Sequence, residues 1–124
     1  MKHIIIEPTK FSPRVELNPT GEILIHGRSI VEDSHAFYTP ILEWVSGCES
    51  NSLKVEVKLD YMNTSSSKQI YSLLILIQER FDAKNVLVNW FYEEGDEDIY
   101  ELGKEFESQL GLTFCFYEFA EILS

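Results

Sequence analysis

The chain of 124 residues carries a formal net charge of −11, and 44% of its residues are hydrophobic. This length fits one compact domain, which we expect to span residues 1–124 around one hydrophobic core. The apolar fraction is too high for a disordered chain. The negative charge opposes binding to nucleic acid or to an anionic membrane surface, so neither is an expected partner.

The sequence carries no pattern that predicts export, membrane insertion or a disulfide framework. The first apolar run, residues 4–6, is too short for a signal sequence or a membrane span, and charged residues soon follow the longest run, residues 73–77. Cys48 and Cys115 lie far apart and outside any Cys-x-x-Cys pair, so we expect structural thiols in a reducing compartment. A cytoplasmic protein is therefore expected.

The N-terminal segments predict short strands, two of which form a hairpin. Residues 3–7, 14–18 and 22–27 have the character of strands. Between the last two lies Asn18-Pro19-Thr20-Gly21, in which proline and glycine are placed to reverse the chain. Residues 22–27 are therefore expected to return beside residues 14–18.

A helix is expected over residues 33–46, with Asp33 and Ser34 as capping candidates in its first turn. Its apolar residues recur at roughly helical spacing, at Phe37, Ile41, Leu42, Trp44 and Val45. Pro40 lies within this segment, and a proline removes a backbone donor and clashes with the preceding turn. Either the helix kinks at Pro40 or it begins later.

Residues 53–60 alternate apolar and polar side chains over eight positions, which is the clearest strand pattern in the chain. The alternation predicts an interior strand with one face covered and the other partly wet. An amphipathic helix of about four turns should follow. Its buried face is expected to contain Ile70, Leu73, Leu74, Ile77 and Phe81.

The last third of the chain repeats the order of strand and helix. A strand is expected over residues 85–91, and the acidic residues 93–98 should begin a helix, because negative charge complements a helix N-terminus. The buried stripe of that helix is expected at Ile99, Leu102, Phe106 and Leu110. Gly111 should end the helix, and residues 113–119 form a last strand.

Strand, helix, strand, helix and strand in succession from residue 53 predict right-handed crossovers that feed a mostly parallel sheet. Added to the N-terminal hairpin and the first helix, this pattern predicts an α/β fold. The expected sheet is mixed but mostly parallel, with about three helices.

The candidate functional site is the segment from Asp60 to Lys68, where the alternating strand passes into its helix. Asn63 is followed there by four hydroxyl residues, Thr64, Ser65, Ser66 and Ser67. The unbonded backbone donors of a first helical turn would face this loop, and such donors favour anions. The residues alone leave open the alternative that Asn63, Thr64 or Ser65 is only an N-cap.

The segment Asp60-Tyr61-Met62-Asn63-Thr64-Ser65-Ser66-Ser67-Lys68 resembles the signature of the SiaC family of bacterial regulatory phosphoproteins, in which Asn-Thr-Ser-Ser is followed by one variable residue and Lys. The resemblance extends to the acidic residue and Ser34 at the first helix start, to Glu43-Trp44-Val45 and to Asn89-Trp90-Phe91-Tyr92. It therefore covers most of the chain.

This resemblance implies a fold similar to the STAS domain of anti-sigma-factor antagonists, and it implies that Thr64 is phosphorylated. A dedicated Ser/Thr protein kinase and a metal-dependent Ser/Thr phosphatase are the implied enzymes. The unphosphorylated form of the family is expected to bind and activate a diguanylate cyclase, which raises cyclic di-GMP and promotes biofilm growth.

The neighbours of the implied phosphate site are Asp60, Tyr61, Asn63, Ser65, Ser66 and Lys68. Lys68 lies four residues after Thr64, which is one helical turn, and could pair with a phosphate there. Its alternative role is an ordinary solvated lysine.

Other functions have less support in the sequence. His3, His26 and His35 lack the spacing of a metal site, and the acidic residues 93–98 lack the ligand pattern of a calcium loop. Three isolated glycines, Gly95, Gly103 and Gly111, are expected at turns or helix ends, so no phosphate-binding glycine loop is present. We therefore expect a protein that is not an enzyme and has no cofactor or metal. The alternative is a small α/β enzyme, or an anion- or nucleotide-binding module, that uses the helix start at residues 63–66.

Overall fold

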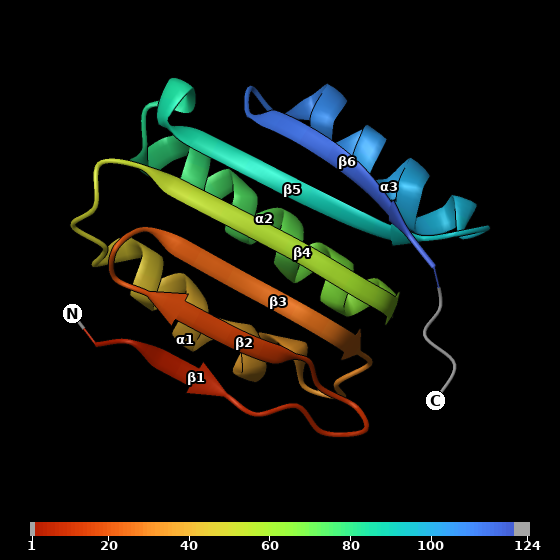
Figure 1. Ribbon diagram of the computed structural model, residues 1–124. Helices are drawn as coiled ribbons and strands as arrows, with labels where there is room; N and C mark the ends of the chain where they lie inside the picture. The colour runs from red at the N-terminus through yellow and green to blue at the C-terminus, as the bar shows by residue number, and fades with distance from the viewer. Residues whose placement is uncertain (1, 121–124) are drawn as a thin grey trace.

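The strands form one sheet in which each strand neighbours the next in chain order (Figure 1). The computed structural model describes residues 2–120. Its elements are β1 (Ile4–Ile6), β2 (Arg14–Asn18), β3 (Glu22–Ser29), α1 (Ser34–Ser46), β4 (Leu53–Met62), α2 (Thr64–Arg80), the short 3-10 helix η1 (Ala83–Asn85), β5 (Val86–Glu93), α3 (Glu97–Gln109) and β6 (Thr113–Phe119). The predicted α/β class with three helices is confirmed.

The sheet is mixed and mostly parallel, as predicted. β1, β2 and β3 pair antiparallel, whereas β3, β4, β5 and β6 pair parallel. The β2–β3 hairpin turns at Gly21, whose φ of +111° favours glycine. A Cβ atom at Gly21 would also lie 2.2 Å from the Ser52 carbonyl oxygen. β4 occupies an interior position between β3 and β5.

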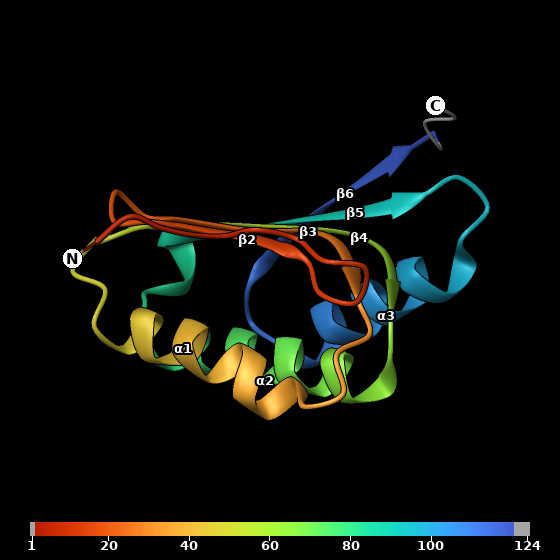
Figure 2. The ribbon, with the colours of Figure 1, turned by 90° about the horizontal axis from the view of Figure 1, so that it is seen from below.

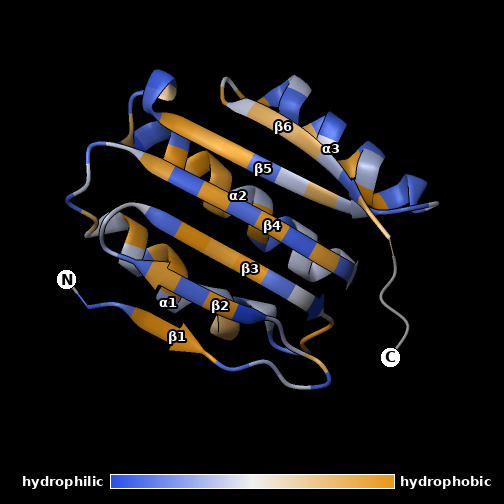
Figure 3. Cartoon of the chain, in the orientation of Figure 1, coloured by the Kyte–Doolittle hydropathy of each residue, from blue (hydrophilic) through white to orange (hydrophobic). Residues whose placement is uncertain are grey.

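All three helices cover one face of the sheet, and the other face is bare (Figure 2). This follows from the sequential strand order, because right-handed crossovers that advance in one direction place every helix on the same side. The alternation of β4 reflects the two environments: Val55, Val57 and Leu59 are buried beneath the helices, and Lys54 is exposed. Figure 3 shows the same alternation of hydrophobic and hydrophilic residues along the central strands.

The helix α2 buries the face that the sequence predicts. Ile70, Leu73, Leu74 and Ile77 are each at most 1% exposed, and Phe81 is also buried as the C-cap residue. Within residues 2–120, no helix is long and apolar enough to cross a membrane.

Several strand ends and one helix boundary differ from the sequence prediction. β1 is shorter, at Ile4–Ile6, and β5 runs to Glu93 because it pairs with β6 up to Phe119. β3 and β4 each extend two residues further, to Ser29 and Met62, because these strand ends pair with each other. α3 ends at Gln109, so the assignment of Gly111 as its terminator is wrong. Leu110 caps that helix in an extended conformation, and the Gly111 amide instead donates to the Gln78 side chain.

Pro40 lies inside α1, which begins at Ser34, so the alternative of a later helix start is wrong. Asp33 is the N-cap and accepts a hydrogen bond from the Ala36 amide at 3.0 Å. A proline at position 40 cannot donate to the carbonyl of Ala36, and Ala36 and Pro40 are both exposed to solvent. Water can therefore serve that carbonyl.

Gly103 was expected at a turn or helix end, but it lies in the middle of α3 and is buried. A Cβ atom on this residue would lie 2.5 Å from Nε1 of Trp90. The indole N–H donates to the Ile99 carbonyl at 2.9 Å, and the ring also packs edge-on against Phe106. The absence of a side chain at Gly103 therefore lets α3 sit directly on the β5 tryptophan.

Replacing Leu74 with alanine should lower the free energy of unfolding by about 2 to 5 kcal/mol, because it removes a fully buried side chain and leaves a cavity. Urea denaturation measures the loss. The exposed Ser72 of the same helix provides the control, and Ser72→Ala should change stability by less than about 0.5 kcal/mol. Equal values for the two variants would contradict the assigned packing face.

Gly103→Ala should destabilise the protein by about 1 to 3 kcal/mol, although alanine is normally the better residue inside a helix. The added methyl group collides with the Trp90 indole, which should also change its fluorescence. Gly47→Ala is the matched control, because a Cβ atom there meets nothing closer than 3.8 Å. A Gly103→Ala variant as stable as the wild type would show that Trp90 can move aside.

Candidate functional site

The turn between β4 and α2 lies at the end of the molecule where the parallel strands β3, β4 and β5 finish (Figures 1 and 2). The connection from β3 to α1 and the loop from β1 to β2 lie at this same end. The strand ends are fixed by pairing, since Ser29 of β3 is in register with Met62 of β4. The turn is thus held by long-range contacts as well as by its own sequence.

Asn63 is the N-cap of α2 and has an extended backbone, with φ −80° and ψ 170°. Its side-chain oxygen accepts hydrogen bonds from the Ser66 amide at 2.9 Å and from the Ser65 hydroxyl at 3.2 Å. The cap therefore satisfies one of the free donors of the first helical turn.

Asn63 also fastens the turn to the chain that leaves β3. Its amide donates to the Ser29 carbonyl at 2.9 Å, and its side-chain amide donates to the Val31 carbonyl at 3.2 Å. One residue therefore joins the start of α2 to the segment that leads into α1. The sequence assigns Asn63 to the site but carries no local signal for these two contacts.

Ser66, placed by the sequence among the neighbours of the phosphate site, points into the interior and is fully buried. Its hydroxyl accepts a hydrogen bond from Ser29 at 2.7 Å, and Ser29 shares a further hydrogen bond of 2.8 Å with the Tyr38 hydroxyl. This buried chain connects α2, β3 and α1. Burial raises the pKa of Tyr38 to about 12, against a smaller lowering by the hydrogen bond with Ser29.

Thr64 is the first residue of α2 and directly follows the N-cap residue Asn63. Thr64 is exposed, and its hydroxyl has no hydrogen-bond partner within residues 2–120. The hydroxyl of Thr64 is therefore not required for capping, which Asn63 performs.

The remaining predicted neighbours separate into two groups. Asp60, Tyr61 and Asn63 line a hollow of about 730 Å³, together with Arg28, Ile30 and Glu93. Within the hollow, Arg28 pairs with Asp60 at 3.5 Å. Ser65 and Lys68 lie on the exposed side of α2, and Lys68 has no ion-pair partner in the described part of the chain.

Ser29, Val31 and Tyr38 belong to the hydrogen-bond network that holds the turn, and the sequence did not predict this role. Ser29 lies 37 positions from Ser66, and Val31 lies 32 positions from Asn63. Tyr38 reaches this network through Ser29, which lies nine positions before it. The parallel pairing of β3 with β4 is the feature that brings them together. A helical or strand periodicity cannot report such contacts, because it describes only local spacing.

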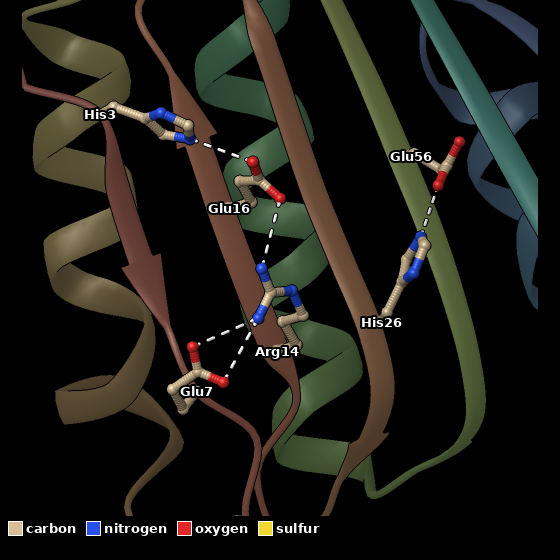
Figure 4. Close-up of polar contacts among 6 residues, drawn as sticks. All are labelled: His3, Glu7, Arg14, Glu16, His26 and Glu56. Atoms are coloured by element: carbon tan, nitrogen blue, oxygen red, sulfur yellow. Dashed lines mark hydrogen bonds and ion pairs between the residues drawn. The ribbon is translucent and has the colours of Figure 1, made fainter.

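His3 and His26 each contact a glutamate carboxylate on the bare face of the sheet (Figure 4). His26 lies 2.5 Å from Glu56, His3 lies 3.0 Å from Glu16, and Arg14 bridges Glu16 and Glu7. Among residues 2–120 there is no group of three or more His, Cys, Asp or Glu side chains placed to hold a metal ion.

Comparison with known proteins gives the same relationship from sequence and from structure. The SiaC family regulatory phosphoproteins match residues 6–119. A protein of Pseudomonas aeruginosa strain UCBPP-PA14, described as uncharacterized, is 26% identical over 120 residues, covering 93% of this chain and 95% of the relative.

Two solved structures from Pseudomonas aeruginosa have the same fold. One is a crystal structure of the diguanylate cyclase SiaD in complex with its activator SiaC, with 25% identity, a TM-score of 0.83 and coverage of 94% of this chain and 99% of the other. The other is SiaC, with 24% identity, a TM-score of 0.84 and coverage of 96% and 100%.

The fold and the turn define a two-layer α/β protein with an exposed hydroxyl residue at the first position of a helix. The chain belongs to the SiaC family of regulatory phosphoproteins. The resemblance inferred from the Asn63 to Lys68 segment is thereby confirmed at the level of the family.

Raising the pH from 10 to 12 should lower the stability of the wild-type protein more than that of Tyr38→Phe, by about 2 to 3 kcal/mol. The folded-state pKa lies above the unfolded value of 10.0, so the stabilisation is present below pH 10 and is lost as the pH rises toward 12. Urea denaturation of both proteins over this range measures the difference. If the free energies of unfolding of the two proteins changed equally with pH, the burial of an un-ionised Tyr38 hydroxyl would be contradicted.

Proposed function

We propose that this protein is a non-enzymatic, cytoplasmic bacterial signalling switch that is reversibly phosphorylated on Thr64. In its unphosphorylated form it binds and regulates an effector, for which a diguanylate cyclase is the proposed class. The observation that carries the proposal is the Thr64 hydroxyl, which is exposed and unbonded at the first position of α2 within a family of regulatory phosphoproteins.

A phosphate on Thr64 is compatible with the folded domain. Phosphorylation adds about −1.5 to −2 charge and three acceptor oxygens, and the N-terminus of a helix favours negative charge. The cap contacts of Asn63 do not involve the Thr64 hydroxyl, so they can persist after modification. Lys68, one turn further on and unpaired among residues 2–120, is the proposed counter-charge.

Modification should instead change what docks against this end of the molecule. The hollow beside the turn contains Ile30 and the exposed Tyr61 as well as carboxylates. A doubly charged group is expensive to bury in such an interface unless a counter-ion accompanies it. Phosphorylation is therefore proposed to release the effector, and dephosphorylation to restore binding.

The proposed partners are a Ser/Thr protein kinase, a metal-dependent Ser/Thr phosphatase and the effector. The cyclase is the favoured effector because a structural neighbour, SiaC of Pseudomonas aeruginosa, is the activator found in complex with the diguanylate cyclase SiaD. Signalling through cyclic di-GMP, with biofilm growth as its outcome, follows from that assignment.

The binding of a small anion or nucleotide at the helix start is the less favoured function. Asp60 and Glu93 both line the hollow beside the turn, and Arg28 is already paired with Asp60. Two carboxylates disfavour a phosphate-bearing ligand there. A switch, by contrast, needs only an accessible hydroxyl and a docking surface.

Thr64→Ala and Thr64→Asp used as baits in native cell extract should identify the effector, with Thr64→Ala retaining it and Thr64→Asp releasing it. Calorimetry with the purified effector should then give at least about a tenfold weaker Kd for the phosphorylated form, which is about 1.4 kcal/mol. Ser72→Asp places the same charge two turns further along α2 and serves as the control. Equal affinity of the unmodified and phosphorylated forms would mean that Thr64 only begins a helix.

A further inference from the structure

The two most exposed aromatic side chains among residues 2–120 lie at the same end of the molecule as Thr64. Phe11 is 61% exposed and Tyr61 is 55% exposed. Phe11 lies in the loop between β1 and β2, and Tyr61 lies near the end of β4, two segments that Figures 1 and 2 place at this end. Exposed aromatic residues of this kind are enriched where proteins bind one another.

The loop that presents Phe11 is fixed by its own hydrogen bonds. The Thr9 hydroxyl accepts from the amides of Phe11 at 3.1 Å and Ser12 at 3.0 Å, and it also bonds to the Ser12 hydroxyl. The Phe11 carbonyl accepts from the Ile30 amide at 2.9 Å. The ring is therefore held out from an ordered loop, which lowers the entropic cost of burying it against a partner.

Two hollows meet at this end and share Ile30. One, of about 740 Å³, is lined by Phe11, Ile30, Val31 and Phe37, and the other is the 730 Å³ hollow that contains Tyr61. The apolar residues that line the two hollows are Phe11, Ile30, Val31, Phe37 and Tyr61, and we call them the Phe11–Tyr61 surface. This surface adjoins the turn between β4 and α2 that carries Thr64, because the Val31 carbonyl accepts a hydrogen bond from the side-chain amide of Asn63.

The charged residues around the Phe11–Tyr61 surface are mostly acidic. Glu32 and Asp33 line the first hollow, and Asp60 and Glu93 line the second. Arg28 is the basic residue lining them, and it pairs with Asp60. A partner with complementary charge must therefore bring lysine or arginine side chains to this rim.

We propose that the Phe11–Tyr61 surface is the docking site of the effector, and that its occupant is an effector segment with apolar anchor residues flanked by lysine or arginine. This inference rests on the proposed function for the identity of the effector. The basic side chains of the occupant pair with the acidic rim, and its apolar anchors pack against the aromatic and aliphatic side chains of the Phe11–Tyr61 surface. A phosphate on Thr64 then adds a dianion beside a rim that already carries four carboxylates, and Lys68 offsets only part of that charge.

The bare face of the sheet also carries aromatic residues, but these residues pack against other side chains of the same chain. Tyr117 stacks on Phe91 with ring centres 4.9 Å apart. The Lys58 ammonium lies over the rings of Phe91 and Phe119, at 5.5 and 4.9 Å. Tyr117, which is 44% exposed, is therefore the matched control for the two aromatic residues of the docking surface.

Calorimetry of the full chain with purified SiaD from Pseudomonas aeruginosa tests the proposal. Phe11→Ala and Tyr61→Ala should each weaken binding by about tenfold or more, and Tyr117→Ala should leave Kd within about twofold of wild type. Glu32→Lys should also weaken binding, because it reverses one charge of the rim. Circular dichroism and urea denaturation of each variant confirm that the fold is intact.

Wild-type affinity in both Phe11→Ala and Tyr61→Ala overturns the proposal, as does a loss confined to Tyr117→Ala. Tighter binding by Glu32→Lys overturns the basic character of the occupant, and no binding of SiaD by the wild type overturns SiaD as an occupant of this surface. Thr64→Asp in the same assay separates the two proposals. If Thr64→Asp binds SiaD normally and Phe11→Ala does not, the phosphoswitch proposal fails and the docking proposal stands. If Thr64→Asp fails to bind and Phe11→Ala binds normally, the docking proposal fails and the phosphoswitch proposal stands.

Discussion

The burial of one face of β4 beneath the helices fixes most of this structure. Val55, Val57 and Leu59 face the helical layer, and each side chain between them faces the bare side of the sheet. A shift of one residue in the pairing of β4 would carry Lys58 and its charged neighbours into the core. The same register also fixes the position of the turn between β4 and α2. It buries Leu59, places Met62 beside Ser29 and brings Asn63 to the end of the strand.

The turn combines a frame of side chains that are held by hydrogen bonds with the Thr64 hydroxyl, which has no hydrogen-bond partner among residues 2–120. Asn63 caps α2 and holds the chain that leaves β3, while Ser66 anchors the helix to a buried hydroxyl chain that reaches Tyr38. Thr64 takes part in none of these side-chain contacts. Chemistry on its hydroxyl can therefore change the charge at the molecular surface while the frame underneath keeps its shape. This arrangement is compatible with the reversible phosphorylation that we propose for Thr64.

Local patterns in the sequence predicted the helices and strands. The features that these patterns did not predict depend on contacts between segments that are distant in the sequence. The alternation in β4 and the apolar stripe of α2 arise from local spacing, so both could be predicted. The inward orientation of Ser66 and the interior position of Gly103 depend on residues 37 and 13 positions away. A serine in a polar run and an isolated glycine carry no sign of such partners. Phe11 was missed as well, because a single phenylalanine between Lys10 and Ser12 does not indicate whether its ring is buried or exposed.

The three helices of the single layer all begin at the end of the molecule that carries the switch turn, as Figure 2 makes visible. Their caps are Asp33, Asn63 and Asp96. The partial positive charges of three helix N-termini therefore converge where carboxylates are concentrated, and they offset the repulsion among those carboxylates. Added salt screens the repulsion and this compensation together. In this chain of net charge −11, a rise in ionic strength therefore weakens a destabilising and a stabilising contribution at the same time.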